Sequence, residues 1–276
     1  MDELVVVKFG GSIATRSEAV SRDLAALARS GTPLVVVHGG SVDISGVRAR
    51  LGLPDRRLVA PDGLSTRHTD PATLEAIMMA LCGLTKPRLV QALTAAGAIA
   101  VGLTGLDAGL LRARRKHAHR SVVDGRTVVV RDNQSGRISE VNTGLLRLLV
   151  EAGMVPVVSP PAMAEDGQPV NVDADRVAAA VAVALQASCL VLLTGAAGVL
   201  ADPDDPTSTL PNLTIDQQSL PDCATGGMRM KLIAASDALR DGVPRVLIAD
   251  GRTEQPVRRA LAGIGSTTVG IRRQAC

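Results

Sequence analysis

The sequence predicts an α/β fold in which a mainly parallel β-sheet is covered by helices on both faces. Short apolar runs rich in Val and bounded by Gly recur along the chain, separated by longer Ala-, Leu- and Arg-rich stretches with helical spacing. Because these runs are apolar on both faces, each is expected to be a strand buried between two helical layers. The predicted strands are 4–7, 34–37, 99–103, 127–130, 155–158, 190–193 and 246–248.

The helical spacing predicts helices at 16–29, 71–84, 86–96, 142–152, 176–187 and 230–241. Asp70 before Pro71 is a capping residue followed by Pro at the first helical position. Asp173 and Asp175 place carboxylates at the start of another helix, where its dipole favours negative charge. Turn residues at 160–170 mark a soft boundary, and the proline-rich segment 201–222 is predicted to be a long loop.

The composition excludes several classes of function. The chain has 276 residues, one Phe and no Trp or Tyr, so it lacks the rings on which nucleic-acid bases stack. The longest wholly apolar run, 177–185, is about half of a membrane span, and no basic signal region precedes the first strand. Its four cysteines are too widely spaced for a zinc site or a small disulfide framework. We therefore expect a cytoplasmic protein with reduced thiols that binds neither nucleic acid nor membrane.

One short segment carries the excess of positive charge. The formal net charge is +3, and the segment 112–120 holds five cations and no acid, which leaves −2 on the rest of the chain. These cations are Arg112, Arg114, Arg115, Lys116 and Arg120. The segment predicts a patch that meets one acidic partner, with a merely solvated hairpin as the alternative.

Two glycine-rich turns follow the first two predicted strands. Lys8 stands before the pair Gly10-Gly11, and His38 stands before the pair Gly39-Gly40. Unshielded backbone amides next to a lysine can cradle phosphate oxygens, and neighbouring parallel strands end at the sheet edge where α/β proteins bind ligands. The sequence matches neither a P-loop nor a dinucleotide fingerprint. A tight turn with an exposed lysine is the alternative, and we expect His38 only to hydrogen-bond the backbone beneath its turn.

Two polar clusters in the second half complete the set. Asn171, Asp173 and Asp175 precede a helix, where a carboxylate can orient lysines or hold Mg²⁺, although helix capping would explain one of the acids. Lys231 lies in the first turns of another helix, where a cation opposes the helix dipole. Together, these motifs supply two lysines, bare backbone amides and an acidic cluster, but no activated Ser or Cys nucleophile. This combination suits phosphoryl transfer. A carboxylate acceptor fits best because it is ionised at pH 7 and needs no general base.

In their order along the chain, these motifs resemble those of the amino acid kinase superfamily, acetylglutamate kinase branch. The matching motifs are Lys8-Phe9-Gly10-Gly11, His38-Gly39-Gly40, Ser65-Thr66-Arg67-His68-Thr69-Asp70, Asn171-Val172-Asp173-Ala174-Asp175, the stretch 193–200 and Gly226-Gly227-Met228-Arg229-Met230-Lys231. Within that branch, 63–70, 104–107 and 112–120 look like LysZ-type aminoadipate kinases. Those enzymes phosphorylate an amino acid linked through its amino group to a small, acidic LysW-type carrier protein.

This resemblance implies a three-layer αβα sandwich with two lobes. The lobe 1–170 would bind the acceptor and dimerise, and the lobe 171–276 would bind the nucleotide. A homodimer is implied, with the helix 74–84 as a candidate interface and an ordinary core face as the alternative.

The resemblance also implies roles for individual residues. Lys8 and Lys231 would neutralise the transferring phosphoryl group, and Asp175 would orient both lysines. ATP would be the phosphoryl donor, with Mg²⁺, and its adenine would rest on aliphatic side chains. The acceptor would contact Gly39, Gly40, Arg67 and Asn171; the nucleotide would contact Gly10, Gly11, Thr194, Gly195, Gly198, Leu200 and Gly227; and the carrier would contact Arg112, Arg114, Arg115, Lys116 and Arg120.

Two departures from the family pattern stand out. Ser41 follows Gly40 where three glycines are common, and Gly195 follows Thr194 where relatives usually carry Asp. We still expect an active kinase that makes an acyl phosphate on carrier-linked 2-aminoadipate, glutamate or a related amino acid. An N-acetyl-L-glutamate kinase acting on the free substrate is one alternative, and a non-catalytic amino-acid sensor is another.

Overall fold

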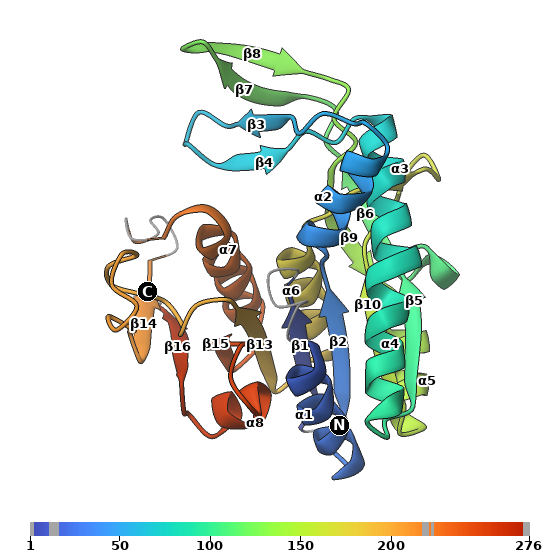
Figure 1. Cartoon of the computed structure of the whole chain (residues 1–276), viewed down its shortest axis with the longest axis vertical. Coiled ribbons are helices and arrows are strands. Elements are labelled where there is room, and N and C mark those ends of the chain that lie inside the picture. The colour runs from blue at the N-terminus through green and yellow to red at the C-terminus, as the bar shows by residue number, and fades with distance from the viewer. Residues whose placement is uncertain (1–2, 11–16, 217–220, 222–223, 273–276) are drawn as a thin grey trace.

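The computed structural model describes residues 3–10, 17–216, 221 and 224–272. At its centre is an eight-stranded sheet in the order β14-β16-β15-β13-β1-β2-β10-β5 (Figure 1). Every neighbouring pair is parallel except β15 and β16. These strands are β1 (Val5–Phe9), β2 (Leu34–His38), β5 (Ala100–Thr104), β10 (Val155–Ser159), β13 (Cys189–Thr194), β14 (Asn212–Ile215), β15 (Val246–Asp250) and β16 (Ser266–Ile271).

Helices cover both faces of this sheet. Side chains of α1 (Ser17–Arg29), α4 (Lys86–Ala95) and α8 (Pro256–Leu261) pack on one face. Those of α5 (Thr143–Glu151), α6 (Ala174–Leu185) and α7 (Gly226–Arg240) pack on the other. The prediction of an α/β fold with a mainly parallel sheet between two helical layers is therefore confirmed.

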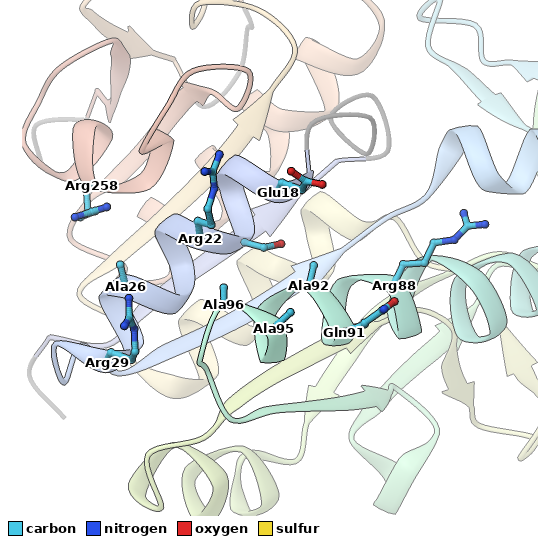
Figure 2. A pocket seen from close by; sticks show the side chains of 11 residues that line it. Glu18, Arg22, Ala26, Arg29, Arg88, Gln91, Ala92, Ala95, Ala96 and Arg258 are labelled. Carbon is cyan, nitrogen blue, oxygen red and sulfur yellow. The ribbon is translucent and has the colours of Figure 1, made fainter.

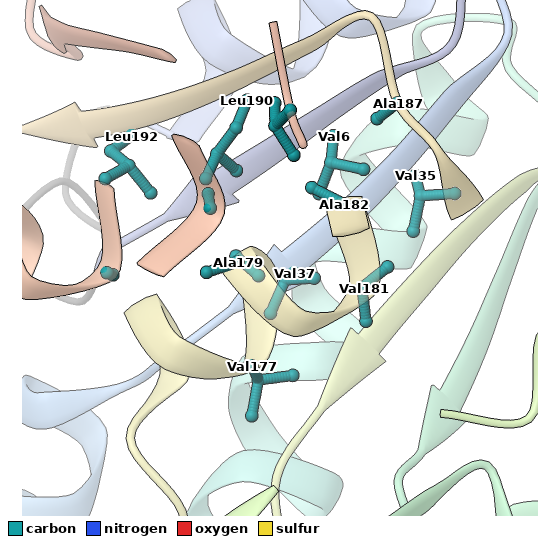
Figure 3. Packing of buried hydrophobic residues seen from close by; sticks show 14 of the residues in the cluster. Val6, Val35, Val37, Val177, Ala179, Val181, Ala182, Ala187, Leu190 and Leu192 are labelled. Atoms are coloured by element: carbon teal, nitrogen blue, oxygen red, sulfur yellow. The ribbon is translucent and has the colours of Figure 1, made fainter. Parts of the chain in front are cut away.

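The core is aliphatic, as the near absence of aromatic residues requires. Val35 and Val37 of β2 point toward α6, where they meet Val177 and Val181 (Figure 3). The alternate residue Val36 is fully buried on the opposite face. Each such side chain contributes about 1.5–3 kcal/mol through burial, which explains why Val recurs on both faces of the central strands.

Smaller elements lie beyond the carboxyl ends of the strands (Figure 1). They comprise two helices, two hairpins and a four-stranded sheet of order β12-β11-β6-β9. Their bounds are α2 (Ser41–Arg50), β3 (Arg57–Val59), β4 (Ser65–Arg67), α3 (Pro71–Ala80), β6 (Leu111–Arg115), β7 (His119–Val123), β8 (Arg126–Val130), β9 (Gly136–Val141), β11 (Ala162–Ala164) and β12 (Pro169–Val170). The hairpins β3–β4 and β7–β8 are linked by a hydrogen bond of 3.1 Å from the amide of Val59 to Ser121 Oγ.

Several predicted elements differ in the structure. The run 127–130 belongs to the β7–β8 hairpin and not to the main sheet, and Val129 is 55% exposed. The segment expected to be a loop contains β14, an edge strand. The predicted helices 71–84 and 86–96 form one continuous unit through a π-helical turn, Leu81–Thr85. The start at Asp70 is as predicted, because its side chain accepts a hydrogen bond from the amide of Thr73 at 2.8 Å.

The main sheet joins the two predicted lobes. Strand β1 pairs with β2 on one side and with β13 on the other, so the division at 170/171 remains a prediction. Among the described residues, no helix has both the length and the apolar character needed to span a bilayer.

Candidate active site

Three charged side chains from distant parts of the chain meet in the interior. Lys8 lies near the end of β1, Asp175 in the first turn of α6 and Lys231 in α7. Asp175 Oδ1 is 2.8 Å from Lys8 Nζ, and Asp175 Oδ2 is 3.3 Å from Lys231 Nζ. The exposed fractions of Lys8, Asp175 and Lys231 are only 6%, 5% and 9%. One carboxylate thus holds two ammonium groups side by side.

The electrostatics of this cluster favour an incoming anion. Burial alone would raise the pKa of Asp175, but the ammonium groups of Lys8 and Lys231 outweigh it and lower that pKa. Burial, together with the charge of Lys8, lowers the pKa of Lys231. Asp173 also attracts both ammonium groups, but burial and the charge of Asp175 raise its pKa, so the two carboxyl groups do not fully compensate two buried cations. Phosphate oxygens would supply the missing negative charge.

The two acids at the start of α6 have different partners. Asp173 is the N-cap residue, and its Oδ1 accepts hydrogen bonds from the amides of Asp175 at 3.0 Å and Arg176 at 3.1 Å. The side chain of Asp175 instead points to the lysines. Helix capping therefore explains Asp173 but not Asp175.

The two glycine turns lie next to each other at one sheet edge. Phe9 and His38 are partners in the parallel β1–β2 register, and the amide of Gly39 donates to the carbonyl of Phe9 at 3.0 Å. Gly10 and Gly39 thus follow neighbouring strands, as predicted; Gly11 lies outside the described residues. Gly40 is the N-cap of α2 and no side-chain cap is found there among the described residues, so the first amides of that helix suit an anion.

A close helix contact explains why position 40 is glycine. A Cβ atom there would lie 2.7 Å from both Leu81 Cδ2 and Thr85 Oγ1. The neighbouring Gly39 also lies close to α6, since a Cβ there would be 3.4 Å from Ala174 Cβ. Glycine therefore lets the start of α2 approach both α6 and the turn at 81–85.

His38 has the structural role expected from the sequence. It is completely buried, and its Nδ1–H donates to the carbonyl of Gly39 at 3.1 Å. Burial lowers its pKa to about 4. The imidazole is therefore neutral at physiological pH and supports the turn from below.

The residues predicted to hold the acceptor lie on the hairpin side of the site. Arg67, on β4, is largely buried, and its Nη1 lies 3.5 Å from Asp55 Oδ1. Asn171 donates from Nδ2 to Thr69 Oγ1 at 3.5 Å. Thr69 is also held by Asn133, whose Oδ1 accepts from the amide of Thr69 at 2.6 Å. The structure thus connects Arg67, Thr69 and Asn171 along one edge of the site.

Asn133 was missed by the sequence reasoning. It is 4% exposed, and its side-chain amide also donates to Ser135 Oγ at 2.8 Å. The polar run Asp132-Asn133-Gln134 directly after the predicted strand 127–130 was a usable signal, because buried amides are normally hydrogen-bonded and fix their surroundings.

The segments predicted to border the nucleotide converge at β16. Thr267 is fully buried, and its Oγ1 accepts from the amide of Val199 at 2.9 Å and donates to the carbonyl of Leu210 at 2.6 Å. Gly198 has φ +146°, and a Cβ there would lie 2.7 Å from the same hydroxyl. Leu200 bridges to Thr209. Thr267 thus fastens the turn after β13 to the loop that follows it.

The remaining predicted nucleotide residues lie at element ends. Thr194 ends β13 and its carbonyl accepts from the amide of Gly251 at 2.9 Å, with Gly195 directly after it. Gly227 is in the first turn of α7, four residues before Lys231. Their roles in nucleotide binding remain predictions.

The basic segment is less uniform than predicted. Arg112, Arg114, Lys116 and Arg120 are exposed. The side chain of Arg115 is only 11% exposed; it pairs with Asp166 at 3.3 Å and hydrogen-bonds Gln134. The expectation of five available cations is corrected to four, because Arg115 fastens β6 to the turn before β12.

A separate cavity lies between α1 and α4 (Figure 2). Its volume is about 800 Å³, and an alanine floor that includes Ala26 and Ala92 is flanked by Arg22, Arg29 and Arg88. None of the described site residues lines it. Within the described parts of the chain, no cluster of three or more His, Cys, Asp or Glu side chains could hold a metal ion.

Comparison with known proteins agrees with this geometry. The chain is 41% identical to a LysW-aminoadipate kinase of Thermus thermophilus, with 95% of this chain and 99% of that protein covered. It is 40% identical to a LysW-aminoadipate kinase of Deinococcus radiodurans, over 95% of this chain and 90% of that protein. The chain is also 42% identical to an acetylglutamate kinase of Symbiobacterium thermophilum, over 90% of this chain and 84% of that protein.

Solved structures show the same fold at low identity. A Giardia carbamate kinase matches with a TM-score of 0.67 and 16% identity, covering 98% of this chain and 99% of that one. An isopentenyl phosphate kinase matches with a TM-score of 0.68 and 19% identity, covering 97% and 100%. The model of the amino acid kinase family matches residues 3–250. With the paired lysines, the glycine turns and these relatives in agreement, the chain belongs to the amino acid kinase family.

Proposed function

We propose that this protein is an ATP-dependent kinase that phosphorylates the side-chain carboxylate of a carrier-linked amino acid. The acceptor is 2-aminoadipate, glutamate or a related amino acid, attached through its amino group to a small acidic carrier of the LysW type. The observation that carries the proposal is the buried Lys8–Asp175–Lys231 cluster beside two glycine turns. The two relatives named LysW-aminoadipate kinases support this acceptor.

In the proposed reaction, the protein supplies positioning and charge. The acceptor carboxylate is already ionised, so the obstacle is repulsion between it and the γ-phosphate. Lys8 and Lys231 neutralise the transferring group, and Asp175 keeps both ammonium groups in place. Backbone amides of the two glycine turns bind phosphate and acceptor oxygens. The acyl phosphate and ADP are the products.

Mg²⁺ is proposed to arrive with ATP. A Mg²⁺ ion bound to phosphates needs only one or two protein carboxylates and supplies charge neutralisation. Asp173 fits this need, because its Oδ1 is used in the helix cap and Oδ2 is the oxygen suited to the metal. Arg67 and Asn171 are proposed to hold the α-side of the acceptor.

The proposed carrier surface consists of the exposed cations Arg112, Arg114, Lys116 and Arg120. They lie on or next to β6 and β7, close to the two hairpins at one end of the molecule (Figure 1). A small free substrate gives no reason for cations there, whereas an acidic protein partner does. Some of this charge is offset locally, since Glu140 lies 4.0 Å from Arg112.

A direct assay decides between the candidate acceptors. Acyl phosphate is trapped with hydroxylamine, using carrier-linked aminoadipate, carrier-linked glutamate and free N-acetyl-L-glutamate in parallel. We expect turnover with a carrier-linked acceptor. Turnover with N-acetyl-L-glutamate alone would make the protein an acetylglutamate kinase, and no product with any acceptor would favour a non-catalytic sensor.

Charge reversal tests the carrier surface. The double variant Arg114→Glu, Lys116→Glu is expected to raise KM for the carrier-linked acceptor about tenfold, because steering and docking of an acidic partner are lost. The control Arg22→Glu, Arg29→Glu makes the same change in charge on α1 and should leave KM unaltered. Equal effects of the two variants would contradict the assigned surface.

We also propose a homodimer. The candidate interface helix is partly a core element, because Ile77 and Leu81 are 1% and 2% exposed and pack against α2. Contact with a second copy would therefore use its outer face, where Met79 is 52% exposed. Light scattering on the wild type and on Met79→Asp tests this, and a wild-type monomer would reject it.

A further inference from the structure

An exposed ion pair joins the β3–β4 hairpin to α7. Arg229, in the first turn of α7, donates from Nη1 to the carbonyl of Asp62 at 2.8 Å and from Nη2 to Asp62 Oδ2 at 3.0 Å. Asp62 is at the turn of the β3–β4 hairpin, which reaches toward α7 in Figure 1. The guanidinium thus grips the backbone and the side chain of the same residue.

The hairpin turn is built to present Asp62. Asp62 Oδ1 accepts from the amide of Leu64 at 3.2 Å, and the amide of Gly63 donates to the carbonyl of Ala60 at 2.8 Å. Gly63 has φ +80°, which glycine adopts without strain. The turn therefore holds the Asp62 carboxylate and carbonyl in fixed directions before Arg229 binds.

Arg229 lies on the same helix as Lys231, which is proposed to neutralise the transferring phosphoryl group. It precedes Lys231 by two residues, and successive helical residues turn by roughly 100°, so the two side chains leave α7 on nearly opposite faces. Lys231 points inward to Asp175 at 3.3 Å, and Arg229 points outward to Asp62. The first turns of α7 are thus held on both sides.

The hairpin also carries the proposed acceptor contact. Asp62 lies in the turn of the hairpin. Arg67 lies at the other end, where it is opposite Arg57 in the antiparallel β3–β4 register. A contact at the turn therefore sets how closely Arg67 and the acceptor approach α7. We propose that Arg229 is a positioning residue that clasps Asp62 and thereby closes the β3–β4 hairpin over the bound acceptor, in register with Lys231. This inference rests on the proposed kinase activity.

The exposure of the pair fits a contact that opens in each catalytic cycle. The side chains of Arg229 and Asp62 are 30% and 57% exposed. Exposed ion pairs are weak and break readily. An acceptor tethered to a carrier protein must enter and leave past this hairpin, so a buried, strong clasp would slow release of the product.

Steady-state kinetics distinguish an effect of Arg229 on the acceptor from an effect on ATP binding. In Arg229→Ala both hydrogen bonds are lost, and KM for the acceptor should rise about fivefold, as expected for one solvated ion pair, while KM for ATP changes less than about twofold. Asp62→Asn keeps the Leu64 contact and the backbone carbonyl, so its effect should be smaller. Arg229→Lys keeps the positive charge but not the two-nitrogen guanidinium contact, so its KM for the acceptor should lie between those of the wild type and Arg229→Ala. A rise in KM for ATP with an unchanged acceptor KM would overturn the proposal.

Hydrogen exchange tests the clasp without any substrate. In Arg229→Ala, amides of 57–67 should exchange faster than in the wild type, whereas 230–240 of α7 should be unchanged. The matched control Arg240→Ala removes an arginine from the other end of α7 and should leave the exchange of 57–67 and the acceptor KM unchanged. Unchanged exchange of 57–67 in Arg229→Ala would reject the clasp. Failure of the proposed activity would instead be seen as absent turnover by the wild type.

Discussion

Asp175→Asn is the sharpest test of the proposed catalytic centre. The substitution keeps the shape of the side chain and removes the charge that lies 2.8 Å from Lys8 Nζ and 3.3 Å from Lys231 Nζ. At an effective dielectric constant of about 20, these attractions are worth about 6 and about 5 kcal/mol before desolvation. Because breaking a buried ion pair costs about 3–5 kcal/mol, we expect the free energy of unfolding to fall by that amount.

Asp175→Asn should lower kcat strongly without weakening nucleotide binding. Without the carboxylate, Lys8 and Lys231 repel each other and leave the geometry needed for transfer, so kcat should fall about 100- to 1000-fold, as when one preorganised group is lost. ATP phosphates can take over part of the missing charge. KM for ATP should therefore not rise, and ATP should raise Tm more in the variant than in the wild type.

The measurements are hydroxylamine trapping of the acyl phosphate and denaturant unfolding. Asp237→Asn is the matched control, because Asp237 of α7 also pairs with α6, through Arg176 at 3.0 Å, and with Arg240 of its own helix at 3.1 Å, but its side chain is 30% exposed. It should lose less than about 1 kcal/mol of stability and no activity. A kcat of Asp175→Asn within about threefold of the wild type, too little to match loss of a preorganised group, would refute the orienting role.

Two further predictions concern stability and nucleotide binding. Burial lowers the pKa of His38 from 6.5 to about 4, so the unfolded chain binds the extra proton first and the free energy of unfolding should fall by about 2 kcal/mol between pH 6.5 and 4.5. His38→Gln should lack this slope in urea titrations, and an unchanged slope would contradict the assignment. Thr267→Val leaves the Val199 amide and the Leu210 carbonyl without their hydroxyl partner, which should cost about 2–4 kcal/mol. KM for ATP should rise in this variant while KM for the acceptor is unchanged, and the reverse result would move the nucleotide away from this region.

Burial on both faces made the central sheet predictable, and exposure made the peripheral strands hard to place. Consecutive Val residues at 127–130 look like a buried strand, yet Val128 and Val129 are 37% and 55% exposed in a hairpin. Conversely, β14 mixes polar and apolar residues because it is an edge strand. Composition alone does not say which Val-rich run is covered by helices, because only the packing of the whole chain decides it.

The site was predictable where local chemistry was unusual. Lys8, Asp175 and Lys231 each stood out beside a buried strand or at a helix start, but no spacing rule brings together residues so distant in sequence; the resemblance to a family did that. Arg115 shows the opposite case. Its partner Asp166 is 51 positions away, so the basic run hides an internal ion pair that sequence cannot distinguish from an exposed cation.

Gly195, which stands where relatives usually carry Asp, does not disturb the geometry of the lysine pair. If an acid at 195 were needed to orient the lysines, its loss would favour a sensor over an enzyme. Asp175 forms ion pairs with both Lys8 and Lys231, so the pair is held without any side chain at 195. The carboxylate of Asp250, opposite Thr194 in the β13–β15 register, is itself bound by Arg252 at 2.8 Å. An effect of glycine at 195 is therefore expected on nucleotide binding and not on the orientation of the lysines, which removes the main support for a non-catalytic protein.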